Sequence, residues 1–191
     1  ALDWLAEAAP GARLMAIGHS IGGHSFAFAD DGGRLAAALA IGSQSGYWAH
    51  WGGAGRLGMW MLMHAGIPLT AKLFGYLPSS ALGMGEDLPA RIATEWAAWC
   101  RTPGYLPAAL DAHDAYGRYR GRLRACWVED DGYAPLRAVE AYLRFFPGAE
   151  QELQSVGLAQ VGTTKIGHFG FFRERFRDSL WREAADWLRA R

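Results

Sequence analysis

Short apolar runs alternate along the chain with stretches of helical periodicity, and this alternation is the strongest structural signal in the sequence. Four such runs predict β-strands at residues 13–18, 35–41, 123–128 and 151–156. Apolar residues at helical spacing predict helices at residues 2–9, 21–29, 135–146 and 176–188. Strands that alternate with helices are typical of a parallel sheet with helical crossovers, so the predicted fold class is α/β.

The pattern changes between about residues 52 and 121. Segments rich in Trp, Met and Leu are separated there by glycines and prolines, which predicts a helical insertion after the second strand. Its large apolar residues either line a substrate pocket or pack together as the core of the insertion, and the sequence leaves both interpretations open. They include Trp48, Trp51, Met59, Trp60, Met61 and Met63.

Composition limits the class of protein. A chain of 191 residues with 51% hydrophobic content can bury one sizeable core, so we expect a single domain over residues 1–191. Basic and acidic residues balance at 19 each and form no basic cluster, which argues against nucleic acid or an anionic membrane as partner. The longest apolar stretch, residues 57–71, is interrupted by His64 and Pro68 and is shorter than the roughly 20 residues of a membrane span.

The cysteines and the first residues of the sequence give weaker indications. Cys100 and Cys126 have neither a disulfide-scaffold pattern nor the spacing of zinc ligands, so we expect buried free thiols. Asp3 and Glu7 lie within the first apolar helix, which does not resemble a secretory signal. The expected location is therefore cytoplasmic.

The candidate chemistry begins at the sequence Gly18-His19-Ser20-Ile21-Gly22. It follows the apolar residues Leu14, Met15, Ala16 and Ile17, so a serine occupies a tight turn at the end of a strand. Flanking glycines suit such a turn, because strained backbone angles leave little room for neighbouring Cβ atoms. Asp131 and then His168 follow later in the chain. These three residues are the predicted catalytic nucleophile, acid and base.

This assignment has a plain chemical reason. A serine hydroxyl is a weak nucleophile at neutral pH, so a neutral imidazole must accept its proton, and a carboxylate must hold that imidazole in the correct tautomer. Simpler interpretations remain: Ser20 as a helix cap, His168 as a loop bridge, and Asp131 as a cap of the helix that starts near Pro135. Asp130 and Glu129 compete with Asp131 for the role of the acid. We interpret His19 as structural.

The three motifs resemble those of the α/β-hydrolase family, in which nucleophile, acid and histidine follow one another in this order. Residues 16–23, 131–135 and 166–170 are similar to the nucleophile elbow, acid loop and histidine loop of bacterial serine esterases. Within the family, the chain is most similar to bacterial predicted hydrolases with a Ser-Gly-Tyr-Trp and a Trp-Cys-Arg segment between nucleophile and acid. Here these are residues 45–48 and 99–101.

The resemblance covers only the part of the family's domain from the fifth strand onward. It implies a half-sheet of strands five to eight with flanking helices and a helical cap, in a domain truncated at its N-terminus. The first strand, containing Leu14 and Ile17, would then be an open edge, which predicts a homodimer or a complementing chain. It also implies that the backbone N–H of Ile21 contributes to the oxyanion hole, while the loop that supplies a second donor lies in the part not covered.

The activity implied is hydrolysis of a carboxylic ester or thioester through an acyl-enzyme on Ser20. The alternative is a catalytically impaired fragment or interaction module. Tyr47, Trp48 and His50 are the predicted substrate-binding residues, since they follow the second strand at the edge where open α/β sheets bind ligands. No metal or organic cofactor is implied, because nucleophile, base and acid are all side chains.

Overall fold

The computed structural model describes residues 2–29, 33–83 and 85–190, which form two compact units. The first, which we call the sheet unit, comprises Ala1–Gln44 and His113–Arg191, and the second, the helical unit, comprises Ser45–Ala112. Residues 113–121, which we had expected within the insertion, belong to the sheet unit. The bounds of the helical unit thus differ from the expected 52 and 121.

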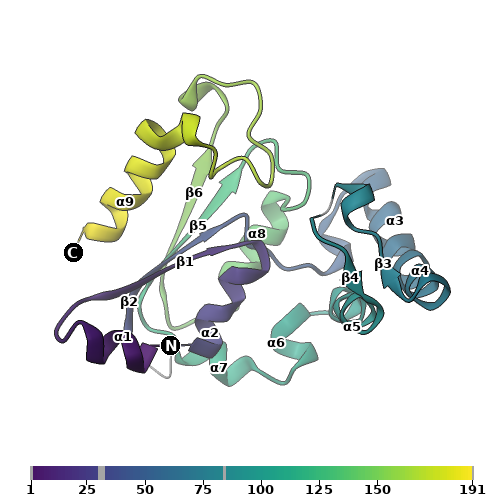
Figure 1. The fold of residues 1–191 in the computed structure, drawn as a ribbon, viewed down its shortest axis with the longest axis horizontal. Helices are drawn as coiled ribbons and strands as arrows, with labels where there is room; N and C mark the ends of the chain where they lie inside the picture. The colour runs from purple at the N-terminus through teal and green to yellow at the C-terminus, as the bar shows by residue number, and fades with distance from the viewer. Residues whose placement is uncertain (1, 30–32, 84, 191) are drawn as a thin grey trace. The chain divides into compact units, whose positions relative to one another are not determined.

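Four parallel strands form the centre of the sheet unit (Figure 1). They are β1 (Leu14–His19), β2 (Leu35–Ile41), β5 (Arg122–Val128) and β6 (Glu150–Val156). Their spatial order is β1-β2-β5-β6, and every adjacent pair is parallel. The sequence predicted each strand to within one residue at either end, and the α/β fold class with a parallel sheet is confirmed.

The helices of the sheet unit cover both faces of this sheet. They are α1 (Leu2–Ala8), α2 (Ser25–Ala29), α7 (His113–Arg118), α8 (Leu136–Leu143) and α9 (Arg182–Arg189). Figure 1 shows α9 on one side of the sheet and α2 with α8 on the other. The chain enters α9 through a 3₁₀ turn at Glu174–Phe176 and a π turn at Arg177–Trp181, so the closing helical region covers the range that the periodicity predicted.

The core forms around β2, whose residues Ala37, Ala38, Leu39 and Ala40 are fully buried. Small alanine side chains on a central strand let helices approach closely from both sides. The core cluster on the α9 face joins side chains of the sheet to those of the closing helical region: Leu39, Ile41, Cys126, Val128, Leu180, Trp187 and Leu188. Cys126 here and Cys100 in the helical unit are free and buried as predicted, and burial raises the pKa of each thiol to about 12.

The two edge strands differ in character. On β1, Met15 and Ile17 remain 42% and 55% exposed, although both are large and apolar. The opposite edge, β6, carries Glu150, Gln151 and Glu152, and such charged and polar side chains protect an edge from pairing with other chains. The apolar open edge of this sheet is therefore β1.

The helical unit contains α3 (Gly53–Met61), a π-helical turn (Leu62–Gly66), α4 (Ile67–Phe74), α5 (Ala90–Arg101) and α6 (Tyr105–Ala109). A short antiparallel pair, β3 (Tyr76–Leu77) and β4 (Leu88–Pro89), connects α4 with α5. The two motif segments meet inside this unit, where a Cβ on Gly46 would lie 3.1 Å from Sγ of Cys100. Within the described ranges, no helix has the length and apolarity to cross a bilayer.

Candidate active site

Ser20 directly follows the last residue of β1 and adopts a left-handed backbone conformation with φ of 53°. A non-glycine residue in this region is uncommon and costs of order 1–3 kcal/mol, and such strain concentrates at functional sites. A 3₁₀ helix at Ser20–His24 and then α2 continue the chain, where the sequence had suggested one α-helix over residues 21–29. The strained serine between strand and helix has the form of a nucleophile elbow.

The glycines around this turn differ in importance. A Cβ on Gly18 would lie 2.7 Å from backbone atoms of Gly22 and Gly23, and one on Gly23 would collide with Oγ of Ser43. Around Gly22, in contrast, space is open within 4 Å. The steric argument from sequence therefore holds for Gly18, extends to Gly23, and is wrong for Gly22.

The structure separates the three consecutive acids that competed in the sequence. Oε2 of Glu129 accepts a hydrogen bond from the backbone N–H of Leu158 at 2.9 Å. Oδ2 and Oδ1 of Asp130 accept the backbone N–H groups of Ile166 and Gly167 at 3.0 and 2.8 Å. Among the three, Asp131 contacts the histidine ring.

Asp131 and His168 form a short, buried contact. Nδ1 of His168 lies 2.7 Å from Oδ2 of Asp131, and the side chains are 6% and 0% exposed, respectively. The other carboxylate oxygen, Oδ1, accepts the backbone N–H groups of Tyr133 and Ala134 at 2.9 and 3.1 Å. Because a carboxylate can only accept, the proton of a neutral His168 resides on Nδ1, which leaves Nε2 free to act as a base.

The end of β2 also contributes to this site. Gly42 has φ of +59°, and a Cβ at this position would lie 3.2 Å from Oδ2 of Asp131 and 3.3 Å from Nδ1 of His168. A side chain here would both strain the backbone and press on the hydrogen-bonded pair. Nothing in the sequence analysis had selected Gly42.

The residue before the nucleophile candidate, His19, contacts the same pair. The ring of His19, the residue before Ser20, is 4.8 Å from the His168 ring, and its Nε2 is 2.8 Å from the His168 carbonyl oxygen. The described hydrogen bonds join Asp131 to His168 but do not extend from His168 to the Ser20 hydroxyl. Catalytic hydrogen bonds are often long without substrate and tighten in the complex.

A buried network of hydrogen bonds holds Gly23 and His24, which belong to the turn after Ser20. Oη of Tyr116 lies 2.7 Å from Nδ1 of His24, and Nε2 of His24 lies 3.0 Å from the Gln44 carbonyl oxygen. Oη of Tyr142 donates to the carbonyl of Gly23 at 2.7 Å. Burial lowers the pKa of His24 to about 4. No local signal in the sequence marks either His24 or its partner Tyr116, which lies 92 residues away.

The predicted substrate-binding residues lie in the helical unit. Trp48 and His50 are the first and last residues of a 3₁₀ turn (Trp48–His50), and the ring of Tyr47 lies 5.7 Å from each of theirs. The guanidinium of Arg56 lies 5.2 Å from the centre of the Trp48 ring. The catalytic candidates belong to the sheet unit. That they share one pocket with the predicted substrate-binding residues stays a prediction.

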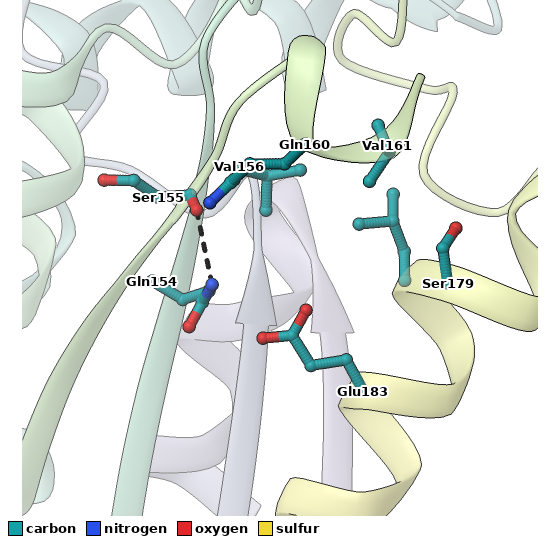
Figure 2. Close-up of a pocket in the computed structure, with 8 residues that line it drawn as sticks. Gln154, Ser155, Val156, Gln160, Val161, Ser179 and Glu183 are labelled. Atoms are coloured by element: carbon teal, nitrogen blue, oxygen red, sulfur yellow. Dashed lines mark hydrogen bonds between the residues drawn. The ribbon is translucent and has the colours of Figure 1, made fainter. Parts of the chain in front are cut away.

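One further pocket of about 220 Å³ lies between the end of β6 and the closing helical region (Figure 2). Figure 2 shows Gln154, Ser155 and Glu183 around it, with the Gln154 amide hydrogen-bonded to the Ser155 carbonyl oxygen. None of Ser20, Asp131 or His168 lines this pocket, so it is not the candidate active site.

Comparison with known proteins identifies the fold. No protein-family model matches the sequence, and no curated protein sequence does. Among solved structures, monoglyceride lipase from Saccharomyces cerevisiae, a soluble variant in complex with a substrate analogue, superposes with a TM-score of 0.59 at 16% identity. The monoacylglycerol lipase of Paleococcus ferrophilus gives 0.55 at 11% identity. The structure described for LipS and LipT, two metagenome-derived lipolytic enzymes, gives 0.54 at 16%.

These matches cover 98% of this chain and 64%, 72% and 69% of the three other chains, respectively. The chain therefore spans about two thirds of the length of these structures. At such identities the similarity establishes the fold, and the chain has the α/β-hydrolase fold that its motifs indicated.

Proposed function

We propose that this chain carries the catalytic centre of a serine hydrolase that cleaves a carboxylic ester or thioester. The observation that supports this most is the buried 2.7 Å contact between His168 and Asp131. Ser20, which has a strained backbone at the end of β1, follows directly after His19, and His19 contacts His168. Ser20 is the nucleophile, His168 the general base and Asp131 the acid that fixes the tautomer of the base. The similarity in fold to lipases and other lipolytic enzymes agrees with ester hydrolysis.

The proposed reaction proceeds in two halves. Oγ of Ser20 attacks the carbonyl carbon while Nε2 of His168 takes its proton, and the imidazolium then protonates the leaving alcohol or thiol as the ester bond breaks. Water, deprotonated by the same nitrogen, attacks the acyl-enzyme; the bond between the acyl carbon and Oγ of Ser20 then breaks, the imidazolium returns its proton to Oγ, and the acid is released. We assign the backbone N–H of Ile21, in the first turn after the nucleophile, to the oxyanion hole; the loss of one such donor typically costs about 10²- to 10³-fold in rate.

Labelling with a fluorophosphonate probe, followed by peptide mass mapping, tests this function. We expect one adduct on Ser20 in the wild type and none in Ser20→Ala, with Ser25→Ala, a nearby exposed serine, as the matched control that keeps the label. Trp48→Ala, assayed in parallel on esters of increasing acyl length, should change chain-length preference but keep the adduct. A folded wild type without adduct would contradict the proposal and favour the non-catalytic module.

We further propose that β1 pairs with a strand of another chain, in a homodimer or with a complementing chain. An apolar groove of about 310 Å³ adjoins this edge, lined by Ile17 and Ile41 of the sheet and by Phe172, Trp181 and Leu188 of the closing region. An open edge with exposed apolar side chains favours strand addition.

Light scattering coupled to size-exclusion chromatography tests the edge proposal. The wild type should elute as a dimer or larger species, and Ile17→Lys should elute as a monomer, because a charge on the edge opposes pairing. Leu153→Lys, on the opposite edge strand, is the matched control and should behave as the wild type. A monodisperse wild-type monomer would count against this proposal.

A further inference from the structure

Besides the bond between the His168 ring and Asp131, hydrogen bonds with Asp130 and with His19 hold the backbone of the loop that carries His168. On its N-terminal side, the carboxylate of Asp130 accepts the backbone N–H groups of Ile166 and Gly167. At His168 itself, the backbone carbonyl oxygen lies 2.8 Å from Nε2 of His19. The second attachment matters more for chemistry, because His19 is the last residue of β1 and is covalently joined to Ser20.

The direction of this hydrogen bond follows from its partners. A carbonyl oxygen only accepts, so Nε2 of His19 carries a proton and donates it. Burial lowers the pKa of His19, which keeps the ring neutral at neutral pH. The ring also packs against aromatic neighbours, with centroid distances of 5.6 Å to both Phe169 and Phe172. Its orientation is thus set both by packing and by the hydrogen bond.

We propose that His19 is a positioning residue for His168: its Nε2–H holds the backbone of the general base at a fixed place relative to the nucleophile. This inference rests on the proposed hydrolase function and adds a residue to it. Asp131 fixes the ring of His168 through Nδ1, whereas His19 fixes the backbone from which that ring projects. Together they determine where Nε2 of His168 lies relative to Oγ of Ser20.

A pair of nearly isosteric substitutions separates the hydrogen bond from packing. Glutamine can donate a hydrogen bond from a terminal amide and methionine cannot, although their side chains have similar length and shape. We expect His19→Gln to keep the rate of fluorophosphonate labelling at Ser20 within about 3-fold of wild type. His19→Met should lower this rate about 10- to 100-fold, because a misplacement of a catalytic group by about 1 Å can cost 10²-fold in rate. His19→Phe, which keeps an aromatic ring without a donor, should resemble His19→Met.

A second readout does not depend on catalysis. The Nδ1–H proton of His168, held by Asp131, should give a low-field NMR signal whose exchange with water reports how firmly the ring is held. We expect faster exchange in His19→Met and His19→Phe and wild-type exchange in His19→Gln, with circular dichroism used to confirm folding. If the wild type is not labelled but these differences appear, the hydrolase proposal fails and the positioning contact stands. If the methionine and phenylalanine variants match the wild type in both measurements, or if glutamine is as impaired as methionine, the positioning role is wrong.

Discussion

Replacing Asp131 by asparagine should lower kcat for ester hydrolysis by about 10⁴-fold, the loss typical when the orienting acid of such a triad becomes an amide. Oδ1 of Asp131 accepts two backbone N–H groups, and an asparagine oxygen would keep that place. The amide nitrogen would then face Nδ1 of His168 and donate to it. The proton of the neutral imidazole would move to Nε2, so the ring could no longer accept the serine proton.

Two neighbouring carboxylates provide controls for this substitution. Glu129→Gln changes an exposed side chain that accepts a hydrogen bond from the backbone N–H of Leu158, away from the histidine ring, and it should stay within about 3-fold of wild type. Asp130→Asn should have an intermediate effect, because it loosens the histidine loop without changing the tautomer of the ring. Rates of Ser20 labelling and of ester hydrolysis are measured together with thermal unfolding. Equal losses in the Asp131 and Glu129 variants, or none in Asp131→Asn, would refute the assigned role of Asp131.

Much of the sheet unit could be predicted from the sequence because its strands are short apolar runs between polar turns. Parallel strands place their carboxyl ends at one edge, so the expectation that Ser20, Asp131 and His168 lie near one another followed from their positions after strands. The sequence offered weaker grounds for choosing the catalytic acid among Glu129, Asp130 and Asp131. Side chains of successive residues point in different directions, and only the turn geometry after β5 sends Asp131 to the ring and Asp130 to the loop backbone.

The sequence was less informative where contacts join distant residues. Residues 113–118 read as part of the insertion, but Tyr116 on α7 is buried and hydrogen-bonded to His24, which places α7 in the sheet unit. Likewise, position 42 requires glycine because a side chain there would press on Asp131 and His168, and both residues are distant from it in the sequence. Composition and periodicity describe which residues are buried, but not which partners they meet.

Acidification should destabilise the fold through His24. Its ring is buried between Tyr116 and the Gln44 carbonyl, and burial lowers its pKa from 6.5 to about 4. The backbone carbonyl oxygen of Gln44 can only accept, so Nε2 carries the proton and Nδ1 accepts from the Tyr116 hydroxyl. A second proton on Nδ1 would leave a charged imidazolium in a buried site without water, and the Tyr116 hydroxyl would have to turn its O–H away. The native state therefore resists protonation.

The sign of the pH effect follows from proton linkage. Well above pH 6.5, His24 is neutral in both the folded and the unfolded state. In that range it therefore does not make the free energy of unfolding depend on pH. Between pH 6.5 and about 4 the unfolded chain binds a proton that the native state excludes, and stability falls with decreasing pH. A pKa difference of this size corresponds to a loss of about 2 kcal/mol from pH 7.5 to pH 5, and about 3 kcal/mol below pH 4.

Urea unfolding at pH 7.5 and pH 5 measures this loss, and His24→Gln supplies the comparison. A glutamine amide can still donate to the Gln44 carbonyl but cannot titrate, so the variant should be less stable at pH 7.5 and should lose about 2 kcal/mol less on acidification. The imidazole NMR signal of His24 in the folded wild type should not shift between pH 7.5 and 5.5. The prediction is wrong if this signal titrates near pH 6.5 and if the free energy of unfolding depends equally on pH in the wild type and in His24→Gln. The native state would then accept the proton, and the buried network would not oppose it.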